Sequence, residues 1–111
     1  MYTVVKEIKI SAAHHLNLNY HSKCCDWHGH NYLIRIHCKS KVLNNDGMVC
    51  DCNKIKNLIV DALDHKKIND IIFQPTRENI AKYVCDIVGK ECFKVEIKET
   101  ENNMVIYEKF T

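Results

Sequence analysis

The chain has 111 residues, and its 16 basic and 14 acidic side chains give a formal net charge of +2. This length predicts a single domain over residues 1–111, and the near balance of charge argues against a nucleic-acid partner. No apolar stretch approaches the ~18 residues of a membrane span, so no membrane partner is expected.

Seven cysteines and the absence of an apolar signal-peptide run predict a cytoplasmic protein with reduced thiols. An odd number of cysteines also argues against a disulfide framework. Most of them, including Cys38, Cys85 and Cys92, are interpreted as small core residues.

Alternating apolar and polar residues predict two strands in the first part of the chain. Residues 4–13 alternate with their apolar side chains mainly on one parity, and residues 31–43 alternate through their first half. The polar cluster at residues 44–47 contains Gly47 and predicts a turn.

Two helices and two further strands are expected after that turn. Asp51 and Thr76 are suitable N-caps, each followed by apolar residues at helical spacing, and Gly89 ends the second helix. Residues 93–100 and 104–110 alternate, with a turn between them. The order β-β-α-α-β-β predicts an α+β fold, a four-stranded antiparallel sheet with both helices on one face.

The segment HGH, with Gly29 between two histidines, opens the second predicted strand. Side chains on a strand repeat every two residues, so His28 and His30 point to the same side. On the first strand His14 shares the parity of the apolar residues, whereas His15 does not. If these strands pair antiparallel, three imidazoles meet on one face at one end of the hairpin.

Three neutral imidazoles and one open position are typical of a catalytic zinc site, whereas structural zinc sites usually have four protein ligands. HGH alone would favour a plain polar loop, but a third histidine in matching phase makes Zn²⁺ the preferred interpretation. His15 could replace His14 if the first strand carries a bulge. His21 and His37 fit no such pattern and are interpreted as surface or packing residues.

Two further groups could carry chemistry. Cys24 lies four residues before His28 and could be a base, a nucleophile or a fourth ligand, and Cys25 competes for each role. Asp64 and His65 are adjacent near the end of the first predicted helix. A carboxylate can orient an imidazole, but on the residues alone this pair is more often an incidental helix ending.

The chain resembles a known family through the ordered motifs SAAHHL, KCCDWHGHNY, GMVCD, LDHKKIND, PTREN and IKET. They are similar to those of the 6-pyruvoyltetrahydropterin synthases over residues 8–107, and most of all to the bacterial 6-carboxy-5,6,7,8-tetrahydropterin synthases of queuosine biosynthesis. The resemblance implies the tunnelling fold. It also implies a homo-oligomer, a trimer or a hexamer, with each active site at a subunit interface.

The resemblance also implies roles for individual residues. The implied zinc ligands are His14, His28 and His30, and the implied catalytic residues are Cys24, Asp64 and His65. Glu99 falls on the glutamate that binds the pterin, where a carboxylate can accept two hydrogen bonds from the ring. Thr76 and Glu78 fall on positions that line the pterin pocket. Lys23 and Arg77 are candidates for the triphosphate by position only.

The implied reaction converts 7,8-dihydroneopterin triphosphate to 6-carboxy-5,6,7,8-tetrahydropterin, with release of acetaldehyde and triphosphate. The alternative is a 6-pyruvoyltetrahydropterin synthase, which keeps the side chain. In that enzyme the cysteine usually lies two residues farther from HGH, where this chain has Ser22. Two non-enzymatic alternatives remain: a zinc-binding module closed by Cys24, Cys25, His28 and His30, or a scaffold protein built on the same sheet.

Overall fold

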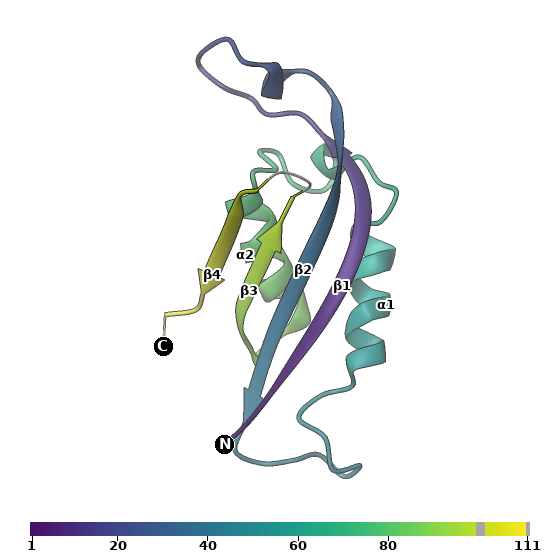
Figure 1. Ribbon diagram of the computed structural model, residues 1–111. Helices are drawn as coiled ribbons and strands as arrows, with labels where there is room; N and C mark the ends of the chain where they lie inside the picture. The colour runs from purple at the N-terminus through teal and green to yellow at the C-terminus, as the bar shows by residue number, and fades with distance from the viewer. Residues whose placement is uncertain (100–101, 111) are drawn as a thin grey trace.

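The computed structural model describes residues 1–99 and 102–110. One antiparallel sheet with the strand order β1-β2-β3-β4 carries both α-helices on a single face (Figure 1). The elements are β1 (Tyr2–His14), β2 (His28–Ser40), α1 (Cys52–Leu63), α2 (Arg77–Val88), β3 (Cys92–Lys98) and β4 (Met104–Glu108), with short 3-10 turns at Lys23–Cys25 and Ile68–Asp70. The predicted α+β class and element order are confirmed.

Hydrogen-bonded pairing between neighbouring strands explains why the strand boundaries differ from the predicted ones. β1 and β2 form a continuous ladder from Tyr2 opposite Ser40 to His14 opposite His28. β2 therefore starts before residue 31, and it ends at Ser40 because β1 offers no partner beyond Tyr2. β4 ends at Glu108, which pairs with Lys94. The strand end expected at residue 100 lies outside the described residues.

Both predicted helix N-caps are present. The Asp51 carboxylate accepts hydrogen bonds from the backbone N–H groups of Asn53 and Lys54, at 3.0 and 3.2 Å. The Thr76 hydroxyl accepts one from the Asn79 N–H at 3.1 Å. Each cap satisfies donors that have no partner within the helix. Gly89 follows α2 with a φ of +114°, a conformation that glycine adopts without a steric penalty.

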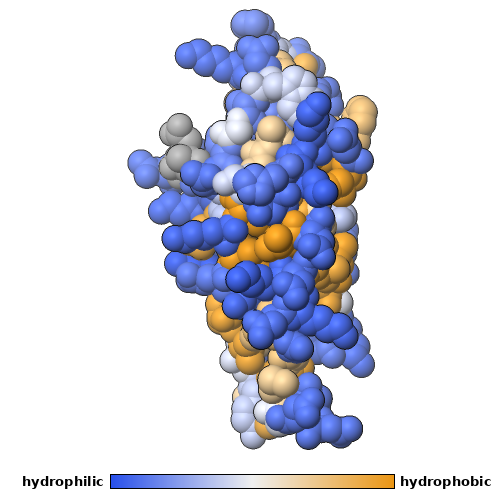
Figure 2. Space-filling view, turned by 90° about the vertical axis from the view of Figure 1, so that its right-hand side faces the viewer, coloured by the Kyte–Doolittle hydropathy of each residue, from blue (hydrophilic) through white to orange (hydrophobic). Residues whose placement is uncertain are grey.

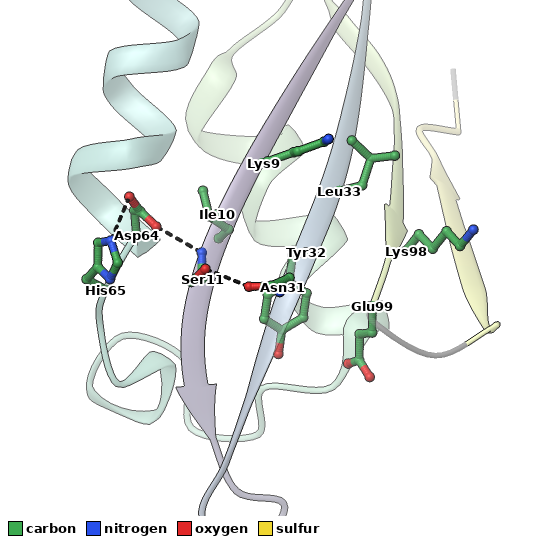
Figure 3. A pocket seen from close by; sticks show the side chains of 10 residues that line it. All are labelled: Lys9, Ile10, Ser11, Asn31, Tyr32, Leu33, Asp64, His65, Lys98 and Glu99. Carbon is green, nitrogen blue, oxygen red and sulfur yellow. Dashed lines mark hydrogen bonds and ion pairs between the residues drawn. The ribbon is translucent and has the colours of Figure 1, made fainter.

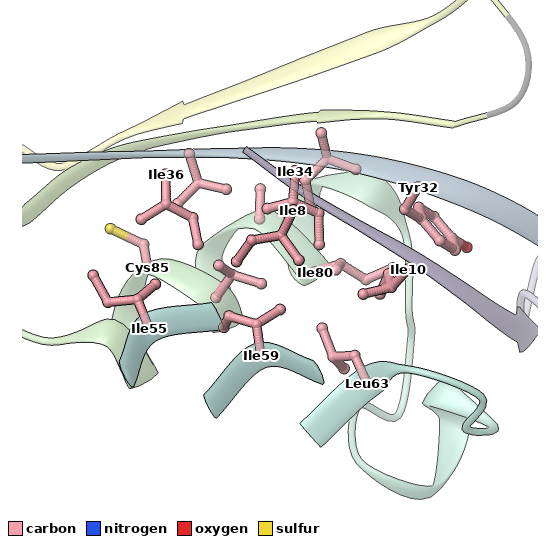
Figure 4. Close-up of a cluster of buried hydrophobic side chains, with 14 of the residues drawn as sticks. Ile8, Ile10, Tyr32, Ile34, Ile36, Ile55, Ile59, Leu63, Ile80 and Cys85 are labelled. Atoms are coloured by element: carbon pink, nitrogen blue, oxygen red, sulfur yellow. The ribbon is translucent and has the colours of Figure 1, made fainter. Parts of the chain in front are cut away.

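The core lies between the inner face of the sheet and the two helices (Figure 4). Ile34 and Ile36 of β2 are at most 1% exposed, and Ile59 of α1 and Ile80 of α2 are fully buried against them. Cys38, Cys85 and Cys92 are also buried, as predicted. Because a slip of one residue would turn every isoleucine of a strand outward, this core fixes the β1–β2 register.

The sheet is open, so its outer strands β1 and β4 each have one side without a strand neighbour in the described chain. Part of the β1 edge is covered, because the Ala13 N–H donates to the Lys66 carbonyl at 3.0 Å. Seen from the α1 side, the middle of the molecule exposes hydrophobic side chains among hydrophilic ones (Figure 2). Within residues 1–99 and 102–110, no helix has both the length and the apolar character that crossing a bilayer requires.

We expect Ile34→Ala to destabilise the fold by about 2–5 kcal/mol, because it removes a fully buried side chain from the centre of the sheet. Urea unfolding followed by circular dichroism measures this change. Val5→Ala, at a β1 position that is 49% exposed, is the control and should cost less than about 1 kcal/mol. Equal losses for the two variants would contradict the assigned core.

Candidate functional site

Three histidines meet where the β1–β2 ladder ends. His14 lies directly opposite His28, and His30 lies opposite Ala12. One ring nitrogen from each histidine can be chosen so that all three lie within 4.8 Å of one another. The ring centroids are 4.5 Å apart for His14 and His28, and 4.8 Å apart for His28 and His30. The predicted convergence of the three imidazoles on one face is confirmed.

Backbone carbonyls orient two of the rings. His14 Nδ1 is 2.7 Å from the Pro75 carbonyl oxygen, and His28 Nδ1 is 2.7 Å from that of Asp26. A carbonyl can only accept, so in each ring Nδ1 carries the proton and Nε2 keeps its lone pair. This is the arrangement in which a histidine ligates a metal through Nε2 while its other nitrogen is fixed by an outer partner.

His14 is the buried member of the group, with 2% of the residue exposed. Burial lowers the pKa of His14 to about 4, so the imidazole is neutral at neutral pH. A metal ligand must be neutral in the same way, because a protonated imidazole has no free lone pair. Three converging imidazole nitrogens fit Zn²⁺, with room for a ligand from outside the protein.

The other histidines lie elsewhere. The His15 ring packs against Trp27, with centroids 4.6 Å apart, so the alternative in which His15 replaces His14 is wrong. β1 carries no bulge up to His14, and the ladder keeps its parity to the end. His37 lies on the outer face of the sheet, where its Nε2 is 2.9 Å from a carboxylate oxygen of Glu96.

A cavity of about 460 Å³ opens onto the three imidazoles. The candidate residues that share its lining are Cys24, Thr76, Glu78, Glu99, Lys23 and Arg77, together with Leu16 and Asn103. The sequence assigned no role to Leu16 or Asn103, because they belong to connecting segments without a periodic pattern. The α2 N-terminus supplies Thr76, Arg77 and Glu78, which the capped start of that helix places at the cavity wall.

The structure separates the two adjacent cysteines. Cys24 lines the cavity, and its carbonyl accepts a hydrogen bond from the Leu16 N–H at 2.7 Å, which ties the turn to the segment after β1. The Cys25 thiol instead faces the Tyr20 carbonyl, with 3.7 Å between sulfur and oxygen. A closed site made of Cys24, Cys25, His28 and His30 is therefore not formed, because the Cys25 thiol lies against the Tyr20 carbonyl. The residue that joins His28 and His30 is His14.

Glu99 connects the three-histidine cluster to the rest of the cavity. Its side chain is 11% exposed, with one carboxylate oxygen 3.4 Å from His30 Nε2 and the other 4.0 Å from Arg77 Nε. Burial, with a smaller contribution from the Glu99 charge, raises the pKa of the neighbouring Tyr32 hydroxyl. A carboxylate held at this depth can accept hydrogen bonds from a polar ring that enters the cavity.

Asp64 and His65 line a different cavity of about 570 Å³, which Glu99 also borders (Figure 3). In that view Glu99 and His65 lie on either side of the paired strands β1 and β2. Asp64 accepts a hydrogen bond from the Ser11 N–H at 2.9 Å, and its other oxygen is 3.6 Å from His65 Nε2. Within one chain, the predicted pair is therefore not brought into the cavity that holds Cys24.

The His65 backbone is unusual. Its φ is +55°, and it is the one non-glycine residue of the described chain with a positive φ. Its N–H donates to the Ser11 carbonyl at 2.6 Å, which holds this left-handed conformation in place. The His65 side chain is 81% exposed.

Comparisons with known proteins agree with this architecture. The family model "6-pyruvoyl tetrahydropterin synthase" matches residues 3–109. A human 6-pyruvoyl tetrahydrobiopterin synthase is 30% identical, over 94% of this chain and 89% of its own. An Archaeoglobus fulgidus protein, provisionally named a 6-carboxy-5,6,7,8-tetrahydropterin synthase, is 41% identical, over 83% of this chain and 81% of its own.

The similarity extends to three dimensions. The structure of Caenorhabditis elegans 6-pyruvoyl tetrahydropterin synthase superposes with a TM-score of 0.79 and 29% identity, covering 98% of this chain and 96% of that one. The expected four-stranded sheet with two helices thus matches a solved structure of the same family. Sequence motifs, fold and family model agree, and the chain belongs to the 6-pyruvoyl tetrahydropterin synthase family.

Proposed function

We propose that this protein is a zinc-dependent 6-carboxy-5,6,7,8-tetrahydropterin synthase, a lyase of queuosine biosynthesis. Its substrate would be 7,8-dihydroneopterin triphosphate, and its products would include acetaldehyde and triphosphate. The observation that carries this proposal is that three converging imidazoles, the Cys24 thiol and the Glu99 carboxylate share one cavity. Family membership restricts the chemistry to pterins and leaves the product to be decided.

In this proposal His14, His28 and His30 hold Zn²⁺. When bound, the metal would polarise hydroxyl groups of the three-carbon side chain and make its carbon-bound protons more acidic. The geometry supports this assignment, because the carbonyls of Pro75 and Asp26 each accept a hydrogen bond from Nδ1 of a ring, which leaves Nε2 of that ring unprotonated.

The remaining roles fall to residues that line the cavity. Glu99 would anchor the pterin by accepting hydrogen bonds from its 2-amino group and a ring nitrogen, with Thr76 and Glu78 lining the pocket beside it. Cys24 would act as thiolate base on the side chain, since it lines the same cavity as the imidazoles. Lys23 and Arg77 supply positive charge near the place where a triphosphate would enter.

Asp64 and His65 require a second subunit in this proposal, because they face another cavity of their own chain. The open edges of β1 and β4 offer backbone groups for pairing between subunits. The exposed, conformationally fixed His65 would then complete the site of a neighbour and move protons on the side of the substrate opposite Cys24. We propose a trimer or a hexamer on this basis.

The choice between the two pterin reactions depends on the cysteine. Cys24 precedes HGH by the short spacing of the queuosine enzymes, and Ser22 occupies the position of the cysteine in the pyruvoyl enzymes. The A. fulgidus relative, at 41% identity, carries the carboxy name, and the human relative, at 30%, carries the pyruvoyl name. The cysteine spacing favours the carboxy enzyme.

Product analysis tests the reaction directly. Purified protein incubated with 7,8-dihydroneopterin triphosphate should release acetaldehyde and form a pterin with a ring carboxylate, both measured by mass spectrometry after derivatisation. A product that retains a three-carbon diketo side chain would establish the alternative 6-pyruvoyl activity. Absence of any pterin turnover by zinc-loaded protein would argue for a scaffold role.

Two variants should distinguish loss of the metal from loss of catalysis. His14→Ala should lose most of the bound zinc, because it removes the buried ligand, whereas His37→Ala should retain it and serves as the matched control. Cys24→Ala should keep the zinc and lower turnover by at least about 100-fold, the effect expected from loss of a catalytic base. Elemental analysis and turnover assays measure the two properties, and a Cys24→Ala protein without zinc would instead make Cys24 a ligand.

Sharing of the site between subunits predicts complementation. Cys24→Ala and His65→Ala should each be inactive alone, but co-expressed chains should recover up to about a quarter of wild-type activity, because random assembly joins an intact Cys24 to an intact His65 in that share of sites. Mixed oligomers carrying two different tags can be isolated and assayed. Inactive mixed oligomers would contradict a site shared between subunits. The His65→Ala protein assayed alone shows whether activity needs the Asp64–His65 pair at all.

A further inference from the structure

The segment that carries Cys24 has little apolar packing to hold it. This Cys24 arm comprises residues 15–27, between β1 and β2, and it extends beyond the end of the sheet (Figure 1). The structure describes the whole of the Cys24 arm, and none of its residues is buried. Two of its large side chains, Tyr20 and Trp27, are 63% and 52% exposed. Because burial does not fix the arm, its hydrogen bonds determine where Cys24 lies.

The free edge of β1 is hydrogen-bonded at alternate residues near its end. The Ser11 carbonyl and the Ala13 N–H bind backbone groups of residues 65–66, at 2.6 and 3.0 Å. Alternate residues of an antiparallel edge strand direct their N–H and C=O groups outward in this way. The same alternation continues past the end of β1 into the Cys24 arm, at His15 and Asn17, although the partners there are side chains.

Two side-chain amides supply these last partners. Asn69 Oδ1 accepts a hydrogen bond from the His15 N–H at 2.9 Å, and Asn69 Nδ2 donates to the His15 carbonyl at 3.0 Å. Gln74 binds Asn17 in the same manner, at 2.8 and 3.0 Å. A primary amide carries an acceptor and donors side by side, so each one reproduces the pairing that a neighbouring strand would offer. We call Asn69 and Gln74 the amide clamps.

The amide clamps enclose the residue that holds Cys24. Leu16 lies between the two clamped residues, and its N–H donates to the Cys24 carbonyl at 2.7 Å. Leu16 and Cys24 also line the same cavity. A shift of the clamped backbone would therefore move the Leu16 N–H, and Cys24 with it.

The amide clamps are anchored beside the candidate metal site. Both belong to the connection between α1 and α2, where the Gln74 carbonyl accepts a hydrogen bond from Asn79 Nδ2 at 2.8 Å. The next residue is Pro75, whose carbonyl orients the His14 ring. One connection therefore fixes both a candidate zinc ligand and the Cys24 arm.

We propose that Asn69 and Gln74 are positioning residues, which hold Cys24 at the cavity through the backbone of the Cys24 arm. This inference rests on the proposed function, in which the Cys24 thiolate is the base. Neither amide lines the cavity, so they would act on the arm rather than on the substrate. Misplacing a reacting group by about 1 Å can lower a rate by about 100-fold.

Apolar side chains of similar shape would remove the clamps one at a time. Zinc-loaded Asn69→Leu and Gln74→Met should each lower kcat for 7,8-dihydroneopterin triphosphate by about 10- to 100-fold. The change in KM should be smaller, because Glu99 and the three histidines lie outside the arm. Asn69→Asp keeps the acceptor for the His15 N–H and loses the donor, so it should lie between wild type and Asn69→Leu. Asn57→Leu, at an exposed position of α1, is the matched control and should retain both constants.

Hydrogen exchange followed by NMR tests the clamps without any turnover. In Asn69→Leu and Gln74→Met the Leu16 amide should exchange at least about tenfold faster than in wild type, because a neighbouring residue has lost two hydrogen bonds. The Ile34 amide, in the centre of the sheet, should keep its wild-type rate and shows that the fold is intact. Since each clamp has its own variant, loss of the fold in one leaves the other to decide.

Three results would overturn the proposal. One is an unchanged exchange rate of the Leu16 amide in both variants. Another is faster exchange with an unchanged kcat, and the third is a rise in KM alone, since Cys24 would then not need the amide clamps. Wild-type protein that turns over no pterin would instead refute the proposed function, and the exchange rates would still decide whether the two amides hold the arm.

Discussion

The register of the β1–β2 ladder is the constraint on which the rest of this molecule depends. Isoleucines on one parity of both strands are buried beneath the helices, and the same parity carried to the end of the ladder places His14 opposite His28. A slip of one residue would expose the core and separate the imidazoles in a single step. The stability of the core and the geometry of the candidate metal site therefore have a common origin.

The candidate site places a neutral, buried imidazole next to charged groups. His14 has a pKa of about 4 because it is buried, and the Pro75 carbonyl fixes which of its nitrogens carries the proton. Around it, Lys23 and Arg77 contribute positive charge while Glu78 and Glu99 contribute negative charge. The cavity lining therefore carries charges of both signs, and Arg77 lies beside Glu99.

The two ends of the sheet carry different chemistry. Nitrogen donors and carboxylates surround the cavity at the end of the β1–β2 hairpin that its connecting loop closes, whereas Cys38 and Cys92 pair near the opposite end of β2. Thirteen residues of continuous β2 connect them. A strand of this length keeps these buried cysteines apart from the cavity beside the three histidines.

The element order, both helix caps, the buried parity and the three imidazoles could be predicted from the sequence, because they follow from local periodicity and short-range hydrogen bonds. It also singled out Cys24, although not over Cys25 without the family resemblance. The folded structure was needed to show that Cys24 faces the cavity and Cys25 does not, and that Leu16 and Asn103 line it. It also placed Asp64 and His65 in a separate cavity. Those outcomes depend on how segments distant in the chain pack together, which no local pattern records.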